Sequence, residues 1–551
     1  MAKKQEAITA VELAKAQKEI SVSEFFAKNR HLLGFDNPRK ALLMAVKEAV
    51  DNSLDATFEA RILPEIYVEL QQLKEDRFKV IVEDNGPGIV KEQIPKIFGK
   101  LLYGSKFFRL RQSAGQQGIG ISAILLYGQL TTGKGMYITS RISAKKPANY
   151  YEIHIDTQKN QPIIKQEKIV EWKKEHGTRI EVELQGSYQK GKQSVDEYLK
   201  EIALINPHAE ITYKMPDNQT ISYIRGINEL PKETREIKPH PYGVELGVLI
   251  RMLNSTKTGS VSGFLQNEFS RVSQKVAQEV CERAKINPKA EPSTIIREQA
   301  EVLYNAIQNT KVMAPPTDCL SPLGEEALIN GLKKEIDAEF YCAVTRSPAV
   351  YRGMPFSIEV GVAFGGNIDK EGQVRLMRFA NRVPLLYQQG ACATSEAIID
   401  TAWKNYGLSQ SKNSIPIGPA IIVIHMVSVW VPFTSEAKES VAHYPEIIKE
   451  MKLALQEVGR KMASYIRKNV KAREQRERVN LFEKYIPELA ASLSELSGRK
   501  KVEIQASLEK VLKKGLKNLL EEAKENEEVE IKGENVAFGE KQKKLDEVEN
   551  D

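Results

Sequence analysis

The sequence predicts an α/β (α+β) protein built from several domains, and three observations support this prediction. Helical and strand patterns are mixed over residues 1–225, helical patterns alone fill about 244–308, and strands return over 321–432 before a long amphipathic helix. The length of 551 residues suits roughly three to five domains. A hydrophobic fraction of 41% and a charged fraction of 28% exclude a fibrous or largely disordered chain.

The N-terminal region begins with a polar arm, Met1 to Glu19, and continues into a helix. Asp36-Asn37-Pro38 announces this helix, because proline suits the first helical position. Its apolar residues recur at spacings of three and four and form one stripe: Leu43, Val46, Val50, Leu54 and Phe58. Strands are expected at 78–83, where apolar and polar residues alternate, and at 150–155 and 178–184. We therefore expect an α/β sandwich.

Prolines mark the next two boundaries. Those at 231, 239 and 241 predict a linker around 227–242, and those at 315, 316 and 322 follow the helical stretch. One helical element begins near Ser262 and carries five apolar residues: Phe264, Phe269, Val272, Val276 and Val280.

Strands and a long helix are expected in the C-terminal half. The strands are predicted at 356–364 and 420–431, and the helix at 445–470. One side of this helix carries Ile448, Met451, Leu455, Val458, Met462 and Tyr465. Beyond Leu496 the Lys/Glu-rich composition predicts a loosely attached helix followed by disorder.

Composition also limits the class of protein. No apolar run reaches the roughly 18 residues of a membrane span, and the N-terminus lacks the apolar core of a signal peptide. We therefore expect a soluble, cytoplasmic protein with no membrane partner. The four cysteines are isolated, which disfavours a zinc site. Residues 525–551 hold ten acidic and four basic residues, a net charge of −6, which leaves +13 for the rest and permits nucleic acid binding.

The first candidate site is Glu48-Ala49-Val50-Asp51-Asn52. Glu48 and Asn52 are four residues apart, so they project from the same helical face, away from the apolar stripe. An amide oxygen is a suitable Mg²⁺ ligand, and a nearby carboxylate can orient and deprotonate a water molecule. The alternative is an ordinary solvated helix face.

The second is Asp84-Asn85-Gly86-Pro87-Gly88, directly after a predicted strand. Asn-Gly in this position also signals a tight turn. In the functional interpretation, Asp84 accepts a hydrogen bond from the exocyclic amine of a base, and Gly86 and Gly88 allow ligand and backbone to approach closely.

The third is a glycine-rich loop before a helix. Glycines in such a loop let backbone N–H groups converge on an anion at the positive end of the helix. The pattern is neither a P-loop nor a dinucleotide fingerprint. Ser105 and Lys106 supply a hydroxyl and an ammonium that close over a nucleotide, or Lys106 is an ordinary surface lysine; Thr178 bonds the ligand or simply starts a strand. The loop residues are Ala114, Gly115, Gln116, Gln117, Gly118, Ile119, Gly120 and Ile121.

The order of these motifs is more specific than any one of them. It resembles the ATPase superfamily of gyrase, heat-shock chaperones, histidine kinases and MutL. The wording EAVDNSLDA (48–56), GKLLYGSK (99–106) and GQQGIGIS (115–122) is similar to the B subunit family of topoisomerase VI, the archaeal type IIB enzyme. The similarity extends to WVPFTSEAK (430–438) and covers roughly 1–490.

This resemblance implies roles for individual residues. Glu48 would be the catalytic general base for ATP hydrolysis, Asn52 the Mg²⁺ ligand, and Asp84 the residue that recognises adenine. Lys438 would be a lysine that reaches the terminal phosphate from the second α/β domain. The nucleotide-binding residues would be Asn52, Asp84, Gly86, Gly88, Ser105, Lys106, the 114–121 loop, Thr178 and Lys438.

The resemblance also implies a domain organisation. It comprises a Bergerat-type ATPase domain with its N-terminal arm at 1–227, a helix-two-turn-helix domain at 228–310, a transducer domain ending in a long helix at 311–490, and a charged flexible tail at 491–551.

The implied activity is that of an ATP-operated clamp. Two B subunits would dimerise with ATP and Mg²⁺, exchange their N-terminal arms, and close around double-stranded DNA. With two A subunits they would form an A2B2 assembly that passes one duplex through another, relaxing supercoils and unlinking DNA. A chaperone or mismatch-repair clamp is the alternative, disfavoured by the Lys438 motif and the helical insertion. A histidine kinase is disfavoured because no phosphoacceptor helix precedes the motifs, where His31 is the only histidine.

Overall fold

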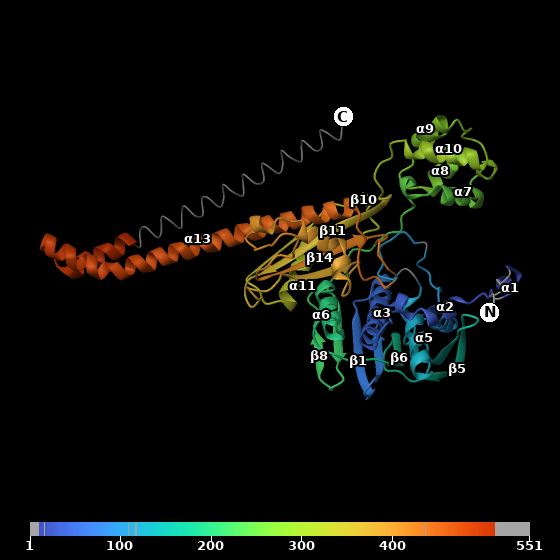
Figure 1. The fold of residues 1–551 in the computed structure, drawn as a ribbon, viewed down its shortest axis with the longest axis horizontal. Coiled ribbons are helices and arrows are strands. Elements are labelled where there is room, and N and C mark those ends of the chain that lie inside the picture. The colour runs from blue at the N-terminus through green and yellow to red at the C-terminus, as the bar shows by residue number, and fades with distance from the viewer. Residues whose placement is uncertain (1–9, 16, 108, 116–117, 436, 513–551) are drawn as a thin grey trace, which may run out of the picture. The chain divides into compact units, whose positions relative to one another are not determined.

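The computed structural model describes residues 10–15, 17–107, 109–115, 118–435 and 437–512 (Figure 1). This part of the chain divides between Ala463 and Ser464 into two compact units. The expectations for Gln116, Gln117, the start of the arm and the acidic tail lie outside the described residues. The four-domain division stays a prediction.

An eight-stranded sheet organises the N-terminal region, with the strand order β5-β4-β3-β6-β2-β1-β7-β8. Only β1 and β7 pair in parallel. The predicted strands 78–83, 150–155 and 178–184 lie within β2, β4 and β6, as the alternation indicated. The strands are β1 (Glu65–Lys74), β2 (Arg77–Asp84), β3 (Met136–Arg141), β4 (Ala148–Asp156), β5 (Gln161–Val170), β6 (Gly177–Gln185), β7 (Glu210–Lys214) and β8 (Thr220–Tyr223).

Three helices cover this sheet and share its core: α3 (Pro38–Glu59), α5 (Gly120–Thr132) and α6 (Val195–Ile205). The α3 helix starts where the sequence predicts, because Pro38 occupies the first turn and the Asn37 side chain accepts a hydrogen bond from the Lys40 N–H at 2.9 Å. Shorter helices are α1 (Ala10–Lys15), α2 (Val22–Lys28) and α4 (Ile94–Gly99). The layered arrangement confirms the predicted α/β sandwich (Figure 1).

Four helices form a separate core: α7 (Leu246–Ser255), α8 (Val261–Glu268), α9 (Gln274–Ala284) and α10 (Arg297–Gln308). The prediction of one element carrying residues 264–280 is wrong. Phe269 is extended, and the side chain of Ser273 accepts a hydrogen bond from the Val276 N–H and starts a new helix. The apolar spacing therefore continues across the boundary between two helices.

A second, six-stranded sheet has the order β10-β11-β14-β12-β13, with β9 also paired to β11. The predicted strand 356–364 lies within β11, but 420–431 is too long. β14 ends at Ser428, whose hydroxyl accepts a hydrogen bond from the Trp430 N–H and so turns the chain. The elements are β9 (Phe340–Thr345), β10 (Ala349–Tyr351), β11 (Met354–Phe364), β12 (Arg375–Ala380), β13 (Val383–Pro384), β14 (Ala420–Ser428), α11 (Glu325–Glu335) and α12 (Ala393–Ile399).

The predicted long helix is much longer than expected. α13 runs over Pro445–Ser497, not 445–470, because helix-favouring polar residues follow the amphipathic stretch. In the first unit its buried side consists of Ile447, Met451, Ala454, Leu455, Val458 and Met462, whereas Ile448 is only partly buried. Within the described ranges, no helix combines the length and apolar character needed to span a bilayer.

Candidate nucleotide-binding site

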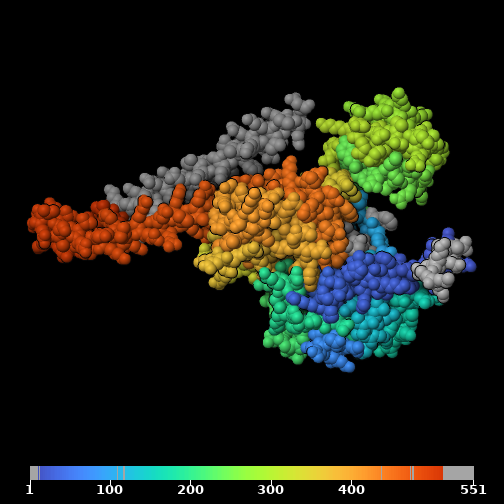
Figure 2. Space-filling view, in the orientation of Figure 1, coloured from blue at the N-terminus to red at the C-terminus, as the bar shows by residue number. Residues whose placement is uncertain are grey.

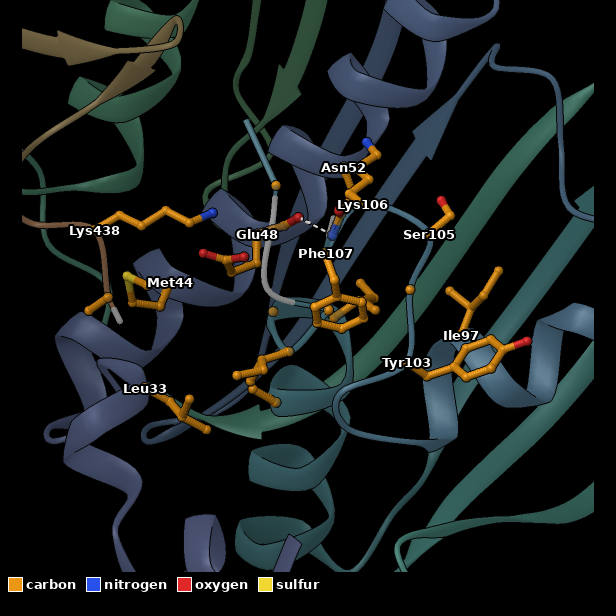
Figure 3. A pocket seen from close by; sticks show the side chains of 18 of the residues that line it. Leu33, Met44, Glu48, Asn52, Ile97, Tyr103, Ser105, Lys106, Phe107 and Lys438 are labelled. Carbon is orange, nitrogen blue, oxygen red and sulfur yellow. Dashed lines mark hydrogen bonds between the residues drawn. The ribbon is translucent and has the colours of Figure 1, made fainter. Parts of the chain in front are cut away.

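One face of α3 supplies the polar residues of the main cavity. Glu48, Asn52 and Asp55 follow one another at spacings of four and three, so they lie on the same side of the helix. The Asn52 Nδ2 atom donates a hydrogen bond to the Glu48 carbonyl oxygen at 2.7 Å, which leaves the amide oxygen as the free acceptor. Glu48 and Asn52 line a cavity of about 560 Å³, together with Lys438 and residues of the glycine-rich loop (Figure 3).

Glu48 is backed by a buried charge cluster. The Lys47 Nζ atom lies 3.5 Å from a Glu48 carboxylate oxygen and 3.0 Å from Asp51, and the Tyr198 hydroxyl donates to Asp51 at 2.8 Å. Burial raises the pKa of Glu48, but the positive charges of Lys47 and Lys438 outweigh it, and the net pKa lies below its ordinary value. Glu48 is therefore an ionised carboxylate at neutral pH.

Gly120 lets the Glu48 carboxylate approach the N-terminus of α5. A Cβ atom at residue 120 would lie only 1.9 Å from a Glu48 oxygen, so a side chain there would displace the carboxylate. The carboxylate thus occupies the positive end of a 13-residue helix, where an anion is favoured.

The segment between α4 and α5 is called the lid below, and its described residues 103–107, 115, 118 and 119 line this cavity. Asp55 of α3 holds the lid in place, because its carboxylate accepts hydrogen bonds from the Ala114 and Gly115 N–H groups at 3.1 and 2.9 Å. The same carboxylate pairs with Lys106 at 2.9 Å, so Lys106 is not the free surface lysine considered above. Burial raises the pKa of Asp55, but Lys106 and the two backbone bonds outweigh it and lower it.

Asp84 lies in a second polar cluster at the end of β2. Its carboxylate accepts hydrogen bonds from the Ser53 hydroxyl at 3.0 Å and from the Gly86 and Thr178 N–H groups at 2.8 and 3.1 Å. The glycine at 88 has a φ of 70°, and a Cβ atom there would lie 2.1 Å from the Arg141 carbonyl oxygen. Because β2 pairs with β1 and β6, the Asn-Gly sequence is not a hairpin turn here.

Lys438 reaches the site from the segment between β14 and α13. Its side chain is only 7% exposed, and its ammonium donates a hydrogen bond to the Ala114 carbonyl oxygen at 2.9 Å. Figure 3 shows the Lys438 side chain extending toward Glu48. The backbone of Lys438 is left-handed, with a φ of 52°, a strained conformation for a residue with a side chain.

The structure thus gathers the predicted residues into two adjoining clusters. The cavity is lined by Glu48, Asn52, Ser105, Lys106, Gly115, Gly118, Ile119, Gly120, Ile121 and Lys438. Ala114 is joined to it through its hydrogen bond with Lys438, whereas Asp84, Gly86, Gly88 and Thr178 are outside its lining.

Sequence reasoning missed three polar residues of this region. Asp55 lies on the same helical face as Asn52, and its spacing signals that position. Lys47 and Asp51 are four residues apart, a spacing that signals an ion pair, but the sequence analysis gave neither residue a role. Both are only 4% exposed.

Comparison with known proteins identifies the family. Residues 37–187 match the histidine kinase-, DNA gyrase B- and HSP90-like ATPase family, and residues 315–478 match the topoisomerase VI B subunit transducer family. The chain is 48% identical to the type 2 DNA topoisomerase 6 B subunit of Methanococcoides burtonii over 504 residues, which is 91% of this chain and 81% of that protein. The chain belongs to the type 2 DNA topoisomerase 6 B subunit family.

Two other members of this family show a similar extent of similarity. The Methanosarcina mazei protein is 48% identical over 91% of this chain and 81% of its own length. The Archaeoglobus fulgidus protein is 47% identical over 90% of this chain and 82% of its own length. The resemblance predicted from the motifs is confirmed, and the ATPase-family region contains most of the cavity described above.

Proposed function

We propose that this chain is the ATP-binding and ATP-hydrolysing B subunit of a type II DNA topoisomerase. The observation that carries the proposal is the Glu48 carboxylate, held ionised at the N-terminus of α5 in a cavity that Lys438 also enters. A phosphate chain at this helix end would meet backbone N–H groups and a lysine, the groups that stabilise phosphoryl transfer.

Glu48 is the proposed general base. It accepts a proton from the water molecule that attacks the terminal phosphate. Lys47 and Lys438 keep the carboxylate in the ionised form that this step requires. Asp84, with Gly86, Gly88 and Thr178, is the proposed adenine site, since its carboxylate is buried and held in place by three hydrogen bonds.

Asn52 fits the proposed Mg²⁺ site. Its amide nitrogen is engaged by the Glu48 carbonyl, so its oxygen is available to the cavity as a neutral ligand. Bound Mg²⁺ would neutralise charge on the phosphates. Ser105, Lys106 and the 114–121 loop are the proposed lid contacts.

The proposed biological role is ATP-driven strand passage. Two B subunits dimerise with ATP, closing a clamp on double-stranded DNA, and act with two A subunits in an A2B2 assembly. The names of the related proteins support the topoisomerase assignment and a second type of subunit. The match of residues 315–478 to a transducer family supports transmission of the nucleotide state along the chain.

A Glu48→Gln variant tests the hydrolytic role. It keeps the size of the side chain but removes the base, so we expect ATP turnover to fall at least a hundredfold while a non-hydrolysable ATP analogue still drives dimerisation. Undiminished turnover would remove Glu48 as the base.

The substrate is tested with supercoiled plasmid, ATP and the purified A subunit. Relaxation that requires both this chain and ATP is expected. ATP turnover that is stimulated by denatured protein, with no relaxation of the plasmid, would contradict the topoisomerase assignment and favour a chaperone.

A further inference from the structure

The turn between β12 and β13 contacts the lid. It consists of Asn381 and Arg382, with φ values of 48° and 65°. Two successive residues with positive φ make the tight hairpin turn that usually carries glycine. Neither residue is glycine, so this conformation is held in place by the surrounding contacts.

Those contacts come from the buried core of the second sheet. The Arg382 N–H donates to the His425 Nε2 atom at 2.9 Å, and the opposite ring nitrogen of His425 donates to Glu359 at 2.7 Å. Glu359 also accepts from the Leu323 and Gly324 N–H groups at 2.9 and 2.7 Å. Glu359 and His425 are fully buried. This chain of hydrogen bonds fixes the backbone of the turn.

The side chain of Asn381 joins this turn to the lid. Its Oδ1 atom accepts from the Ser428 N–H at 2.9 Å, and its Nδ2 atom donates both to the Ser428 carbonyl at 2.9 Å and to the Ser113 carbonyl at 3.0 Å. Asn381 is only 7% exposed. The amide therefore bridges the end of β14 and the part of the lid that leads into the glycine-rich loop.

Neighbouring residues of the lid are held in the same way. The Gln112 N–H donates to the Cys319 carbonyl at 3.0 Å, and the Gln112 side chain accepts from the Ser321 N–H at 2.6 Å. The Arg382 guanidinium lies 5.3 Å from the centre of the Phe58 ring on α3. Figure 2 shows residues of the second sheet packed directly against the N-terminal region.

We propose that Asn381 is a positioning residue through which the transducer region sets the lid over the nucleotide, separately from the phosphate contact of Lys438. The proposal rests on the function proposed above and deepens it. Ser113 and Ala114 are adjacent, so Asn381 and Lys438 hold two successive carbonyl groups of the lid. Asp55 holds the next N–H groups from the α3 side. Loss of the Asn381 bond should loosen the lid without removing any group that touches ATP.

An Asn381→Gly variant of the full chain tests this role. Glycine adopts the same positive φ, so the turn survives while the amide bridge is lost. We expect the KM for ATP to rise about five- to tenfold with a smaller change in kcat. Hydrogen exchange of the lid amides should speed up, with unchanged exchange in β14 except at Ser428, whose N–H loses its acceptor. The matched control is Asn218→Gly, because Asn218 is an exposed residue with a φ of 65° in the turn between β7 and β8; it should behave like the wild type.

An Asn381→Asp variant separates positioning from turn formation. Aspartate tolerates a left-handed backbone but places a carboxylate against the Ser113 carbonyl, so its KM should rise at least as much as that of Asn381→Gly. Wild-type KM and lid exchange in both variants would overturn the proposal. If the wild-type chain itself hydrolysed no ATP, the proposed function would fail instead, whatever the exchange data show.

Discussion

At the scale of single residues, the site depends on one buried cation between two carboxylates. Lys47 is 4% exposed and contacts both Glu48 and Asp51. Burial lowers the pKa of Lys47, but the two carboxylates outweigh it and raise the pKa, so the ammonium stays charged. Burial also raises the pKa of Asp51. Lys47 therefore offsets the cost of placing two carboxylates in the protein interior.

A Lys47→Met variant should change both stability and the pH dependence of hydrolysis. It leaves two buried carboxylates without their partner, which should lower the free energy of unfolding by about 3 kcal/mol. The pKa of Glu48 should rise, because burial still raises it and one opposing charge is gone. In the proposed mechanism hydrolysis requires ionised Glu48, so the acidic limb of kcat should move from below the ordinary carboxyl range toward neutral pH.

Urea unfolding and kcat measured from pH 5 to 8 check this prediction. In the wild type, the lowered pKa of Glu48 stabilises the folded state at pH values above the pKa that Glu48 has in the unfolded chain. This stabilisation is lost as the pH falls through the pKa of Glu48 in the folded protein. The control is Lys47→Arg, which keeps the cation. Superimposable pH profiles for Lys47→Met and wild type would contradict the role of Lys47.

The sequence predicted the residues of α3 that line the cavity better than the distant residues that contact the lid. Glu48 and Asn52 lie on one helix, so their spacing alone places them together. The Asn381 to Ser113 contact joins residues 268 positions apart, and no local pattern records such a contact. Lys438 was found only through the wording of its motif, since nothing in its neighbourhood predicts a left-handed backbone.

At the scale of elements, α6 links the two sheets through an acidic side chain. Glu201 is 4% exposed and lies 3.3 Å from Arg375 of β12. Burial and the charge of Glu197, opposed by Arg375, raise the pKa of Glu201 to about 8. In the folded protein this carboxyl group therefore keeps its proton up to about pH 8, whereas in the unfolded chain it loses the proton near the ordinary pKa of glutamate.

A Glu201→Gln variant should remove a pH dependence of stability. Between the ordinary carboxyl pKa and pH 8 the folded state binds more protons than the unfolded chain. The wild-type free energy of unfolding should therefore fall as the pH rises, by at most about 1.4 kcal/mol per pH unit. The glutamine variant should lack this slope and be more stable than wild type at pH 8. Thermal unfolding at pH 5, 6.5 and 8 measures it, with Glu210→Gln, an exposed change on β7, as control; equal slopes in all three proteins would contradict it.

Element boundaries were predicted well where local chemistry sets them. The start of α3 follows from Asn37 and Pro38, and β2 follows from the apolar residues Phe78, Val80 and Val82 at every second position. Elsewhere the apolar spacing was misleading. It continued from α8 into α9 across an extended Phe269, and it ended near residue 470 although α13 continues to Ser497.

At the scale of the whole molecule, the segment 110–115 is one of the places where the N-terminal region and the second sheet meet. Lys438, Asn381 and Gln112 make hydrogen bonds across this junction. A cation that gains a phosphate partner with ATP and loses it after hydrolysis would change the preferred arrangement of the two regions. We therefore expect the coupling between the two regions to depend on Lys438 more strongly than nucleotide binding does.

A Lys438→Asn variant should separate nucleotide binding from strand passage. Asparagine tolerates the left-handed backbone at this position but cannot reach the cavity. ADP lacks the terminal phosphate, so its Kd should stay within about twofold of wild type, whereas plasmid relaxation with the A subunit should fall at least tenfold per ATP hydrolysed. Calorimetry with ADP and relaxation assays paired with phosphate release measure the two quantities.

The control variant is Lys438→Arg, which keeps a cation and should retain part of the coupling. A wild-type number of relaxed links per ATP in Lys438→Asn would exclude Lys438 as the coupling residue, and equally weakened ADP binding would make it a general binding residue instead.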